Sequence, residues 1–214
     1  MLATIVCIEG PSAVGKTTLG MALAKRVGGF VVPEVSGTQP PGESAAWFVD
    51  EHAKRWREAR ESAARVPLVV LDGDPFKGLW YNWIYAAEGW AGIEVVAPLY
   101  RAELRSGDIG FPDLYVVLQA TAATLRSRRM RDATRRRSSF EKHLAMLEPL
   151  DRYFDELSVR APARVVKVET DDRTPGDLVE IVLKEVERLA PPKIDPIRLL
   201  DSMADWVAAG ARRL

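Results

Sequence analysis

Residues 10–17 read Gly-Pro-Ser-Ala-Val-Gly-Lys-Thr and match the pattern G-x-x-x-x-G-K-[ST]. The apolar run Ile-Val-Cys-Ile at residues 5–8 precedes this octet and predicts a strand that is buried on both faces. Apolar residues at helical spacing over 19–27 follow it and predict a helix that stops at Gly28-Gly29. A glycine-rich loop between a strand and a helix predicts a site for the phosphates of a nucleoside triphosphate.

The chemistry of the loop suggests a role for each residue. Gly10 and Gly15 can adopt backbone angles that point successive N–H groups inward, toward an anion. Lys16, near the positive end of the helix, is expected to reach the β- and γ-phosphates, and Thr17 to place its hydroxyl on Mg²⁺. The residues expected to bind the nucleotide are Gly10, Ser12, Ala13, Val14, Gly15, Lys16, Thr17 and Thr18.

Composition excludes several other classes of protein. The 214 residues predict one compact domain, and 30 basic residues balance 30 acidic residues, so no overall positive charge favours nucleic acid. The single cysteine, Cys7, permits no internal disulfide and fits the reducing cytoplasm. The first apolar run is too short to span a membrane, and His52 and His143 are too far apart in the sequence to suggest a zinc site.

Strand and helix patterns alternate along the chain and predict an α/β fold with helices on both sides of a parallel sheet. Four further apolar runs predict strands at residues 30–32, 67–71, 114–118 and 165–168. A Gly/Pro-rich stretch over 36–42 separates the second strand from a helix that carries Val49, Ala53, Trp56 and Ala63 on one face.

Three carboxylates follow predicted strands, at the edge where parallel sheets bind ligands. Glu34 ends the second strand, and Asp72 and Asp74 follow the third. Each could act as a base or hold metal-bound water. Asp72-Gly73 and Asp74-Pro75 are also strong turn dipeptides, so we favour a functional role for Asp72 and leave the role of Asp74 open.

Seven arginines lie within residues 126–137 and precede an apolar helix. Such a run usually forms a solvated face or a nucleic-acid patch. Its position before the helix instead predicts a lid over about residues 121–157, in which two or three arginines stabilise charge on the transferring phosphoryl group. Arg128 and Arg131 are three residues apart and are expected to share one helix face, whereas Arg135 to Arg137, followed by two serines, resemble a mobile tip.

These features together resemble the deoxynucleoside kinase and thymidylate kinase group. The resemblance covers residues 2 to about 190 and depends on the order of short motifs, of which only the phosphate loop is highly specific. The motifs are Glu9-Gly10, Pro33-Glu34, Pro112-Asp113-Leu114, Leu125-x-x-Arg128-x-x-Arg131, Tyr153 and Glu169-Thr170-Asp171-Asp172. The resemblance implies that Glu34 is the base toward the acceptor hydroxyl and that Arg128, Arg131 and, less securely, Arg135 to Arg137 contact phosphates.

The chain departs from that family at Gly73, where an arginine that contacts the acceptor usually follows the acidic residue. Its loss weakens the case for a nucleoside monophosphate acceptor and favours a neutral one that bears a hydroxyl. An aromatic segment over residues 76–90, with Phe76, Trp80 and Tyr81 as its first members, could form the wall of the acceptor pocket or simply pack against the core.

The tail after Pro191-Pro192 lies outside the family pattern. Ile197, Leu200, Met203 and Val207 form an apolar helical stripe. The stripe could mediate a homodimer or cover the site, but packing on its own domain is favoured.

We therefore expect a P-loop NTPase fold with three layers, a five-stranded parallel sheet, an arginine-rich helical lid and an extra C-terminal helix. Residues 1–190 are expected to form the kinase domain and residues 191–214 a helical extension packed on it. The expected activity is ATP- and Mg²⁺-dependent phosphorylation of a small-molecule hydroxyl in the cytoplasm, with no nucleic-acid or membrane partner. A nucleoside monophosphate kinase, with Arg101 or Arg105 replacing the missing arginine, and a regulatory ATPase that binds a macromolecule are the alternatives. The assigned roles are catalytic for Lys16, Glu34, Asp72, Arg128 and Arg131, metal-binding for Thr17 and Asp72, and acceptor-binding for Glu34, Asp74, Phe76, Trp80 and Tyr81.

Overall fold

A computed structural model describes residues 3–35, 45–132, 140–190 and 194–210 of the chain. Within these ranges, five strands form one sheet in the order β2-β3-β1-β4-β5, and every neighbouring pair is parallel. The strands are β1 (Thr4–Glu9), β2 (Phe30–Val32), β3 (Leu68–Asp72), β4 (Leu114–Gln119) and β5 (Val165–Glu169). The predicted five-stranded parallel sheet is therefore confirmed.

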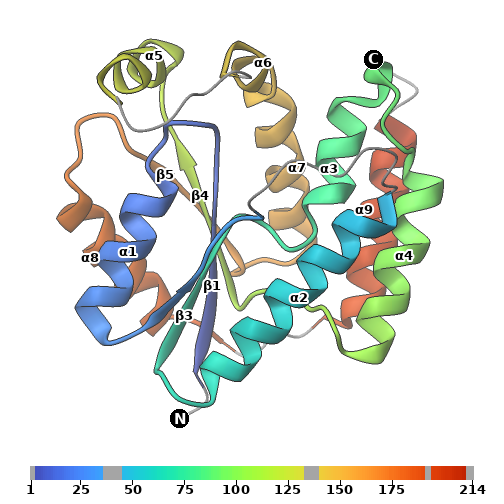
Figure 1. Cartoon of the computed structure of the whole chain (residues 1–214), viewed down its shortest axis with the longest axis horizontal. Helices are drawn as coiled ribbons and strands as arrows, with labels where there is room; N and C mark the ends of the chain where they lie inside the picture. Colours follow the sequence, from blue (N-terminus) through green and yellow to red (C-terminus); the bar gives the residue numbers. More distant parts are fainter. Residues whose placement is uncertain (1–2, 36–44, 133–139, 191–193, 211–214) are drawn as a thin grey trace.

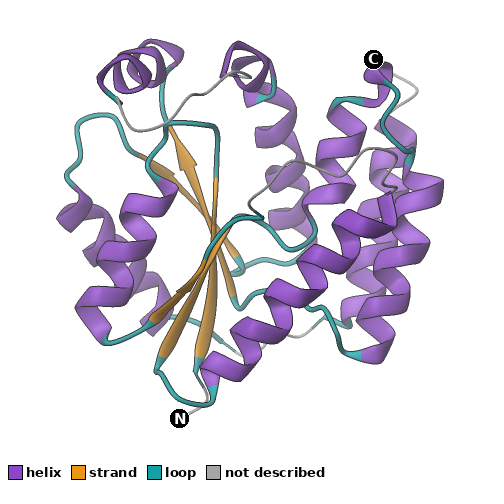
Figure 2. Cartoon of the chain, viewed as in Figure 1, coloured by secondary structure: helices purple, strands orange, loops and turns teal. Residues whose placement is uncertain are grey.

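Helices cover both faces of this sheet (Figures 1 and 2). One face carries α1 (Lys16–Val27) and α8 (Pro175–Glu187), which contact each other. The other carries α2 (Ala45–Ala63), α3 (Lys77–Ile84), α4 (Ile93–Ser106), α7 (Leu147–Arg160) and α9 (Pro196–Gly210). A short 3₁₀ helix, η1 (Ala86–Glu88), follows α3.

The core has two parts because side chains alternate between the two faces of each strand. Cys7 of β1 joins the cluster beneath α2, α3, α4, α7 and α9, while its neighbour Ile8 joins the cluster beneath α1 and α8. Both residues are fully buried. This arrangement explains the uninterrupted apolar run of the first strand and confirms the three-layer fold.

The helices α5 (Ala122–Arg131) and α6 (Phe140–Ala145) lie above the carboxyl ends of the strands (Figure 1). They fall within the predicted lid, which stays a prediction. Arg135 to Arg137 and the Gly/Pro-rich stretch over 36–42 lie outside the described residues.

The helix α9 packs mainly against α4 and also contacts α3 and α7. Its side chains Leu199, Leu200, Met203 and Val207 are buried, whereas Ile197 is only half-buried. Asp201 accepts hydrogen bonds from the guanidinium group of Arg101 on α4. In the described part of the chain, no helix combines the length and the apolar character needed to cross a membrane.

Candidate active site

The loop between β1 and α1 has the backbone conformation that its glycines predict. Gly10 and Gly15 have φ angles of 146° and 108°, in a region that favours glycine. A Cβ atom at Gly10 would also lie 2.6 Å from the carbonyl oxygen of Leu118 in β4. The Nζ atom of Lys16 folds back over the loop and donates to the carbonyl oxygens of Gly10 and Pro11, at 2.8 and 3.3 Å.

The hydroxyl of Thr17 lies beside Asp72 and donates to its Oδ2 atom at 2.6 Å. Thr17 lies in the first turn of α1 and Asp72 ends β3, so the parallel pairing of β1 with β3 brings the two residues together. Burial raises the pKa of Asp72, although the hydrogen bond from Thr17 works against this. Among the described residues, Oδ1 of Asp72 is a buried oxygen without a hydrogen-bond partner.

Glu34 follows β2 and lies at the same edge of the sheet. Its Oε1 atom accepts a hydrogen bond from Nζ of Lys77, the first residue of α3, at 2.5 Å. Burial alone would raise the pKa of Glu34, but the charges of Lys77 and Lys16 and the hydrogen bond from Lys77 lower it to about 2. Glu34 is therefore an anion at neutral pH, held by a nearby cation.

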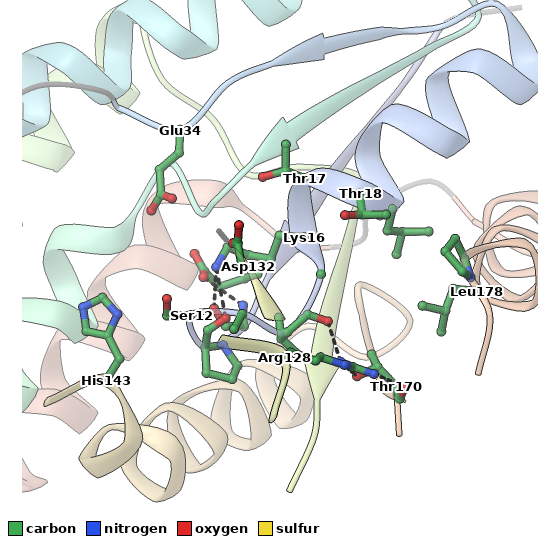
Figure 3. A pocket seen from close by; sticks show the side chains of 18 of the residues that line it. Ser12, Lys16, Thr17, Thr18, Glu34, Arg128, Asp132, His143, Thr170 and Leu178 are labelled. Atoms are coloured by element: carbon green, nitrogen blue, oxygen red, sulfur yellow. Dashed lines mark hydrogen bonds between the residues drawn. The ribbon is translucent and has the colours of Figure 1, made fainter. Parts of the chain in front are cut away.

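The phosphate loop, Thr17 and Glu34 line a cavity of about 900 Å³ (Figure 3). Asp72, which is buried beside Thr17, is not among the described residues that line it. Figure 3 shows His143 and Glu34 toward one end of the cavity, Lys16 near its middle and Leu178 at the other end. Among the described residues, the lining comes from six separate parts of the chain: Glu9 to Leu19, Glu34, Lys77, Tyr81, Arg128, Asp132, His143, Met146, Thr170, Arg173, Pro175 and Leu178.

A second cavity of about 400 Å³ adjoins the first, since Glu34, Lys77, Tyr81 and His143 line both. Its remaining walls are largely aromatic. The residues that line only this cavity are Val35, Trp47, Phe48, His52, Gly78, Asn82 and Trp90. Three rings meet there, because Trp90 lies 5.8 Å from Phe48 and 5.1 Å from Tyr81 between centroids.

Arg128 connects the phosphate loop to the segment after β5. Its guanidinium group donates to the carbonyl oxygen of Val14 at 3.1 Å, and to the hydroxyl and carbonyl oxygens of Thr170 at 2.8 and 2.6 Å. These contacts place it on the side of the cavity where Leu178 lies, away from His143 and Glu34 (Figure 3). Arg128 is thus positioned beside the loop, not at the acceptor end.

Arg131 does not accompany Arg128 into the cavity. Its side chain is exposed and donates to the hydroxyl and carbonyl oxygens of Ser127, one turn earlier in α5. The expectation that both arginines share an inward face is therefore wrong for the described structure. Residues three apart on a helix differ by about 60° in direction, and here that difference turns Arg131 toward solvent.

The predicted aromatic wall is only partly present. Tyr81 lines both cavities, but Phe76 and Trp80 are fully buried in the core and line neither. Phe76 stacks on Phe111 at 4.1 Å, while the indole N–H of Trp80 donates to Asp74. Phe76 caps the start of α3 and Trp80 lies within it, and their rings pack against core aromatics of other helices, Tyr100 of α4 and Tyr153 of α7.

Asp74 also lies in the core and not at the cavity. It accepts hydrogen bonds from the backbone N–H of Phe76, the indole of Trp80 and the hydroxyl of Tyr115. Burial raises its pKa to about 7, because these hydrogen bonds offset only part of the desolvation. Its described contacts make it a structural carboxyl at the start of α3.

Sequence reasoning did not assign several residues that line the main cavity, and Glu9, Lys77 and His143 are the ones that lie around Glu34. Glu9 is part of the Glu9-Gly10 motif, and its position at the end of a buried strand could by itself have indicated a site residue. Its side chain accepts from the backbone N–H groups of Gly10 and Asp74, at 2.8 and 2.9 Å. Lys77 and His143 carry no local signal, because only the tertiary fold brings α3 and α6 to this edge.

Comparison with solved structures identifies the fold. The chain superposes with a TM-score of 0.58 on deoxyadenosine kinase from M. mycoides, at 12% identity, over 86% of this chain and 100% of that one. It superposes on thymidylate kinase from Candida albicans with a TM-score of 0.60, at 12% identity, over 87% of this chain and 92% of that one. For the YorR protein from Bacillus subtilis the TM-score is 0.56 at 16% identity, over 86% of this chain and 96% of that one.

These likenesses confirm, at the level of the fold, the resemblance to the deoxynucleoside and thymidylate kinase group. No protein-family model matches the chain, and no curated protein sequence matches it either. Identities this low establish the architecture alone, so the chemistry has to be argued from the site.

Proposed function

We propose that this chain is a kinase that uses ATP and Mg²⁺ to phosphorylate a hydroxyl group of a nucleoside or nucleoside-like small molecule. The observation that carries the proposal is the position of Glu34, whose carboxylate lines the same cavity as Lys16 and Thr17. A hydroxyl beside Glu34 would face the end of a triphosphate bound on the loop. The fold shared with deoxyadenosine and thymidylate kinases supports the same class of reaction.

Thr17 and Asp72 are the residues that would hold Mg²⁺. They offer a hydroxyl and a carboxylate, the oxygen donors that this ion prefers, and the unpaired buried Oδ1 of Asp72 fits a site completed by a cation. The ion would neutralise charge on the β- and γ-phosphates. Lys16 would contribute a second positive charge from the loop.

In the proposed reaction, a bond forms between the acceptor oxygen and the γ-phosphorus while the bond from that phosphorus to the β,γ-bridging oxygen breaks. ADP leaves, and the hydroxyl proton passes to Glu34 and then to solvent. Such transfers need alignment and charge stabilisation more than strong base catalysis. A carboxylate with a low pKa is adequate for this role, because it has to orient the hydroxyl before it accepts the proton.

The second cavity supports a neutral acceptor that contains a flat ring. Its aromatic walls suit stacking, and Lys77, the cation among its described lining residues, already has Glu34 as a partner. Burial lowers the pKa of His52 and His143, so both imidazoles are neutral at pH 7. Within the described residues, this cavity therefore offers no unpaired positive charge to an acceptor phosphate.

The same geometry weakens the monophosphate kinase alternative. Arg101 forms an ion pair with Asp201 on α9, and Arg105 is exposed at the end of α4. Neither residue lines a cavity, so neither replaces the arginine absent at position 73. A regulatory ATPase would need a partner instead of a small acceptor, and the second cavity, with its aromatic walls beside Glu34, favours the small molecule.

Measurement of ATP turnover with and without a panel of nucleosides, nucleoside monophosphates and other ring-containing alcohols tests the proposal. We expect one neutral alcohol to stimulate turnover and to yield a product heavier by one phosphate in mass spectrometry. Lys16→Ala serves as the control and should lower turnover by about a hundredfold to a thousandfold, because it removes a preorganised charge. Stimulation only by a protein or nucleic acid would instead support the regulatory ATPase.

A further inference from the structure

Two carboxylates approach the backbone of Gly73 at the end of β3. A Cβ atom built at this residue would lie 3.7 Å from Cγ and Oε1 of Glu34 and 3.7 Å from Oε2 of Glu9. Gly73 has a φ angle of 97°, a conformation that strains other residues. The strand therefore contributes no side chain between the two acidic groups, and a balancing charge has to come from another element.

Lys77 supplies that charge from the first turn of α3. Only 22% of its side chain is exposed, and its Nζ atom donates to Glu34 at 2.5 Å. The same ammonium group lies 5.6 Å from the ring centroid of Trp80 and 5.9 Å from that of Tyr81. Because a carboxylate and two aromatic rings contact an ammonium group that is largely buried, Lys77 is held in place and is not a mobile surface charge.

We propose that Lys77 is a positioning residue for the acceptor: by binding Oε1 of Glu34, it fixes the carboxylate where the two cavities meet and presents the second oxygen to the acceptor hydroxyl. This inference rests on the proposed kinase function and adds a residue on which alignment of the acceptor depends. Lys77 acts through Glu34, and it lines both cavities because it stands at their junction.

The charges around Glu34 predict how far its titration depends on Lys77. Loss of Lys77 leaves two cations, Lys16 and Arg55, that also lower the pKa of Glu34. The pKa should therefore rise by about one to two units, without reaching the value expected from burial alone. The groups that face Glu34 are Glu9 from β1, Lys16 from α1, His52 and Arg55 from α2, Asp72 from β3, Lys77 and Tyr81 from α3, and His143 from α6.

The decisive variants are Lys77→Met, which removes the charge but keeps an unbranched side chain, and Lys77→Arg, which keeps the charge. With Lys77→Met, kcat should fall by about tenfold to a hundredfold and KM for the acceptor should rise, while KM for ATP stays unchanged. In a plot of kcat against pH, the fall on the acid side, where Glu34 becomes protonated, should move to higher pH. Lys77→Arg should restore most of the activity and the wild-type pH dependence, since a guanidinium group also binds a carboxylate.

Lys167→Met is the matched control. Lys167 also pairs with carboxylates, those of Asp151 and Asp155, but it lies on β5 and lines neither cavity. Its replacement should leave the rate profile unchanged. If Lys77→Met does not fold, Lys77→Gln, which keeps a hydrogen-bond donor without the charge, is measured in its place.

A second measurement does not depend on turnover. Titration of the carboxyl carbon of Glu34 by NMR, assigned with Glu34→Gln, should show the rise in pKa in Lys77→Met and none in Lys77→Arg. An unchanged titration overturns the proposal, and so does a shifted titration with unchanged kcat and acceptor KM. If the wild-type protein phosphorylates no acceptor, the proposed function fails, whereas the titration still decides whether Lys77 controls Glu34.

Discussion

The three carboxylates that follow β2 and β3 lie in different environments, and their pKa values differ accordingly. Lys77 and Lys16 lower the pKa of Glu34 to about 2 against the effect of burial. Burial raises the pKa of Asp72, and it raises that of Asp74 to about 7, where no cation is in contact. Glu34 is therefore suited to orient a hydroxyl, while Asp74 is half-protonated near neutral pH.

The buried Asp74 should make the stability of the protein depend on pH. Its folded pKa of about 7 exceeds its unfolded pKa, so the folded chain binds more protons between about pH 4 and 7. The contribution of Asp74 to the free energy of unfolding is therefore greatest below pH 4 and is lost as the pH rises through 7. Urea denaturation at pH 5 and pH 8 should show this decrease. In Asp74→Asn the decrease should become smaller, and an equal decrease in both proteins would contradict the assignment.

Asp72 and Glu34 lie in separate environments, so replacing each carboxylate by the corresponding amide should impair a different part of the reaction. Asp72→Asn should raise the Mg²⁺ concentration needed for half-maximal turnover, because it removes a charge beside Thr17. Glu34→Gln should lower kcat with little change in ATP affinity, because the loss falls on the acceptor side. Mg²⁺ and ATP titrations of both variants test this, and exchanged phenotypes would mean that the two roles are reversed.

At the level of the element, α5 presents two arginines to different surroundings. Arg128 connects Val14 in the phosphate loop to Thr170 after β5, whereas the hydrogen bonds of Arg131 to described residues go to Ser127 within its own helix. Only the first arginine is placed to shape the site in this conformation. The family resemblance assigned both to phosphate contacts, and of the two only Arg128 is among the described residues that line the main cavity.

Arg128→Ala should weaken ATP binding by about tenfold or more, because two carbonyl oxygens beside the cavity lose a charged donor. Arg131→Ala should change ATP affinity by less than about threefold, since an exposed side chain that is hydrogen-bonded within its own helix contributes little to ATP binding. Calorimetric titration with ATP compares the two variants directly. Equal losses in both would show that Arg131 also contributes to ATP binding and would contradict this assignment.

At the level of the whole molecule, α9 extends the layer formed by α3, α4 and α7. It buries Leu200 and Met203 against the same core cluster that holds Trp83 and Tyr153. The ring of Trp206 lies 5.2 Å from that of Trp83 between centroids. The apolar stripe of α9 is thus covered within the chain, which removes the argument for a homodimer through this surface.

Leu200→Ala should therefore lower the free energy of unfolding of the whole protein by about 2–5 kcal/mol, the range for a fully buried leucine. Ile197→Ala, on the same helix at a half-buried position, should lower the free energy of unfolding by clearly less. Chemical denaturation followed by circular dichroism compares them. A Leu200→Ala protein as stable as the wild type would mean that α9 is not part of the cooperative core.

The sequence by itself determined the features that depend on neighbouring residues. The strand, phosphate loop and first helix are contiguous, so their apolar spacing and glycines predict both the conformation and the role of Lys16 and Thr17. The alternation of strands and helices predicted the parallel sheet, because such crossovers leave few other arrangements. The carboxyl edge of that sheet brings Glu34 to the cavity and Asp72 into contact with Thr17, while their catalytic roles stay predictions.

Only the tertiary structure decided which side of each helix meets the cavity. Lys77 reaches Glu34 across 43 residues of sequence, and Arg128 reaches Thr170 across 42. Helical periodicity shows that Phe76 and Trp80 share a face, but it does not show whether that face meets the core or the ligand. That choice depends on packing between distant segments, whose free energy is set by the assembled core and not by any local pattern.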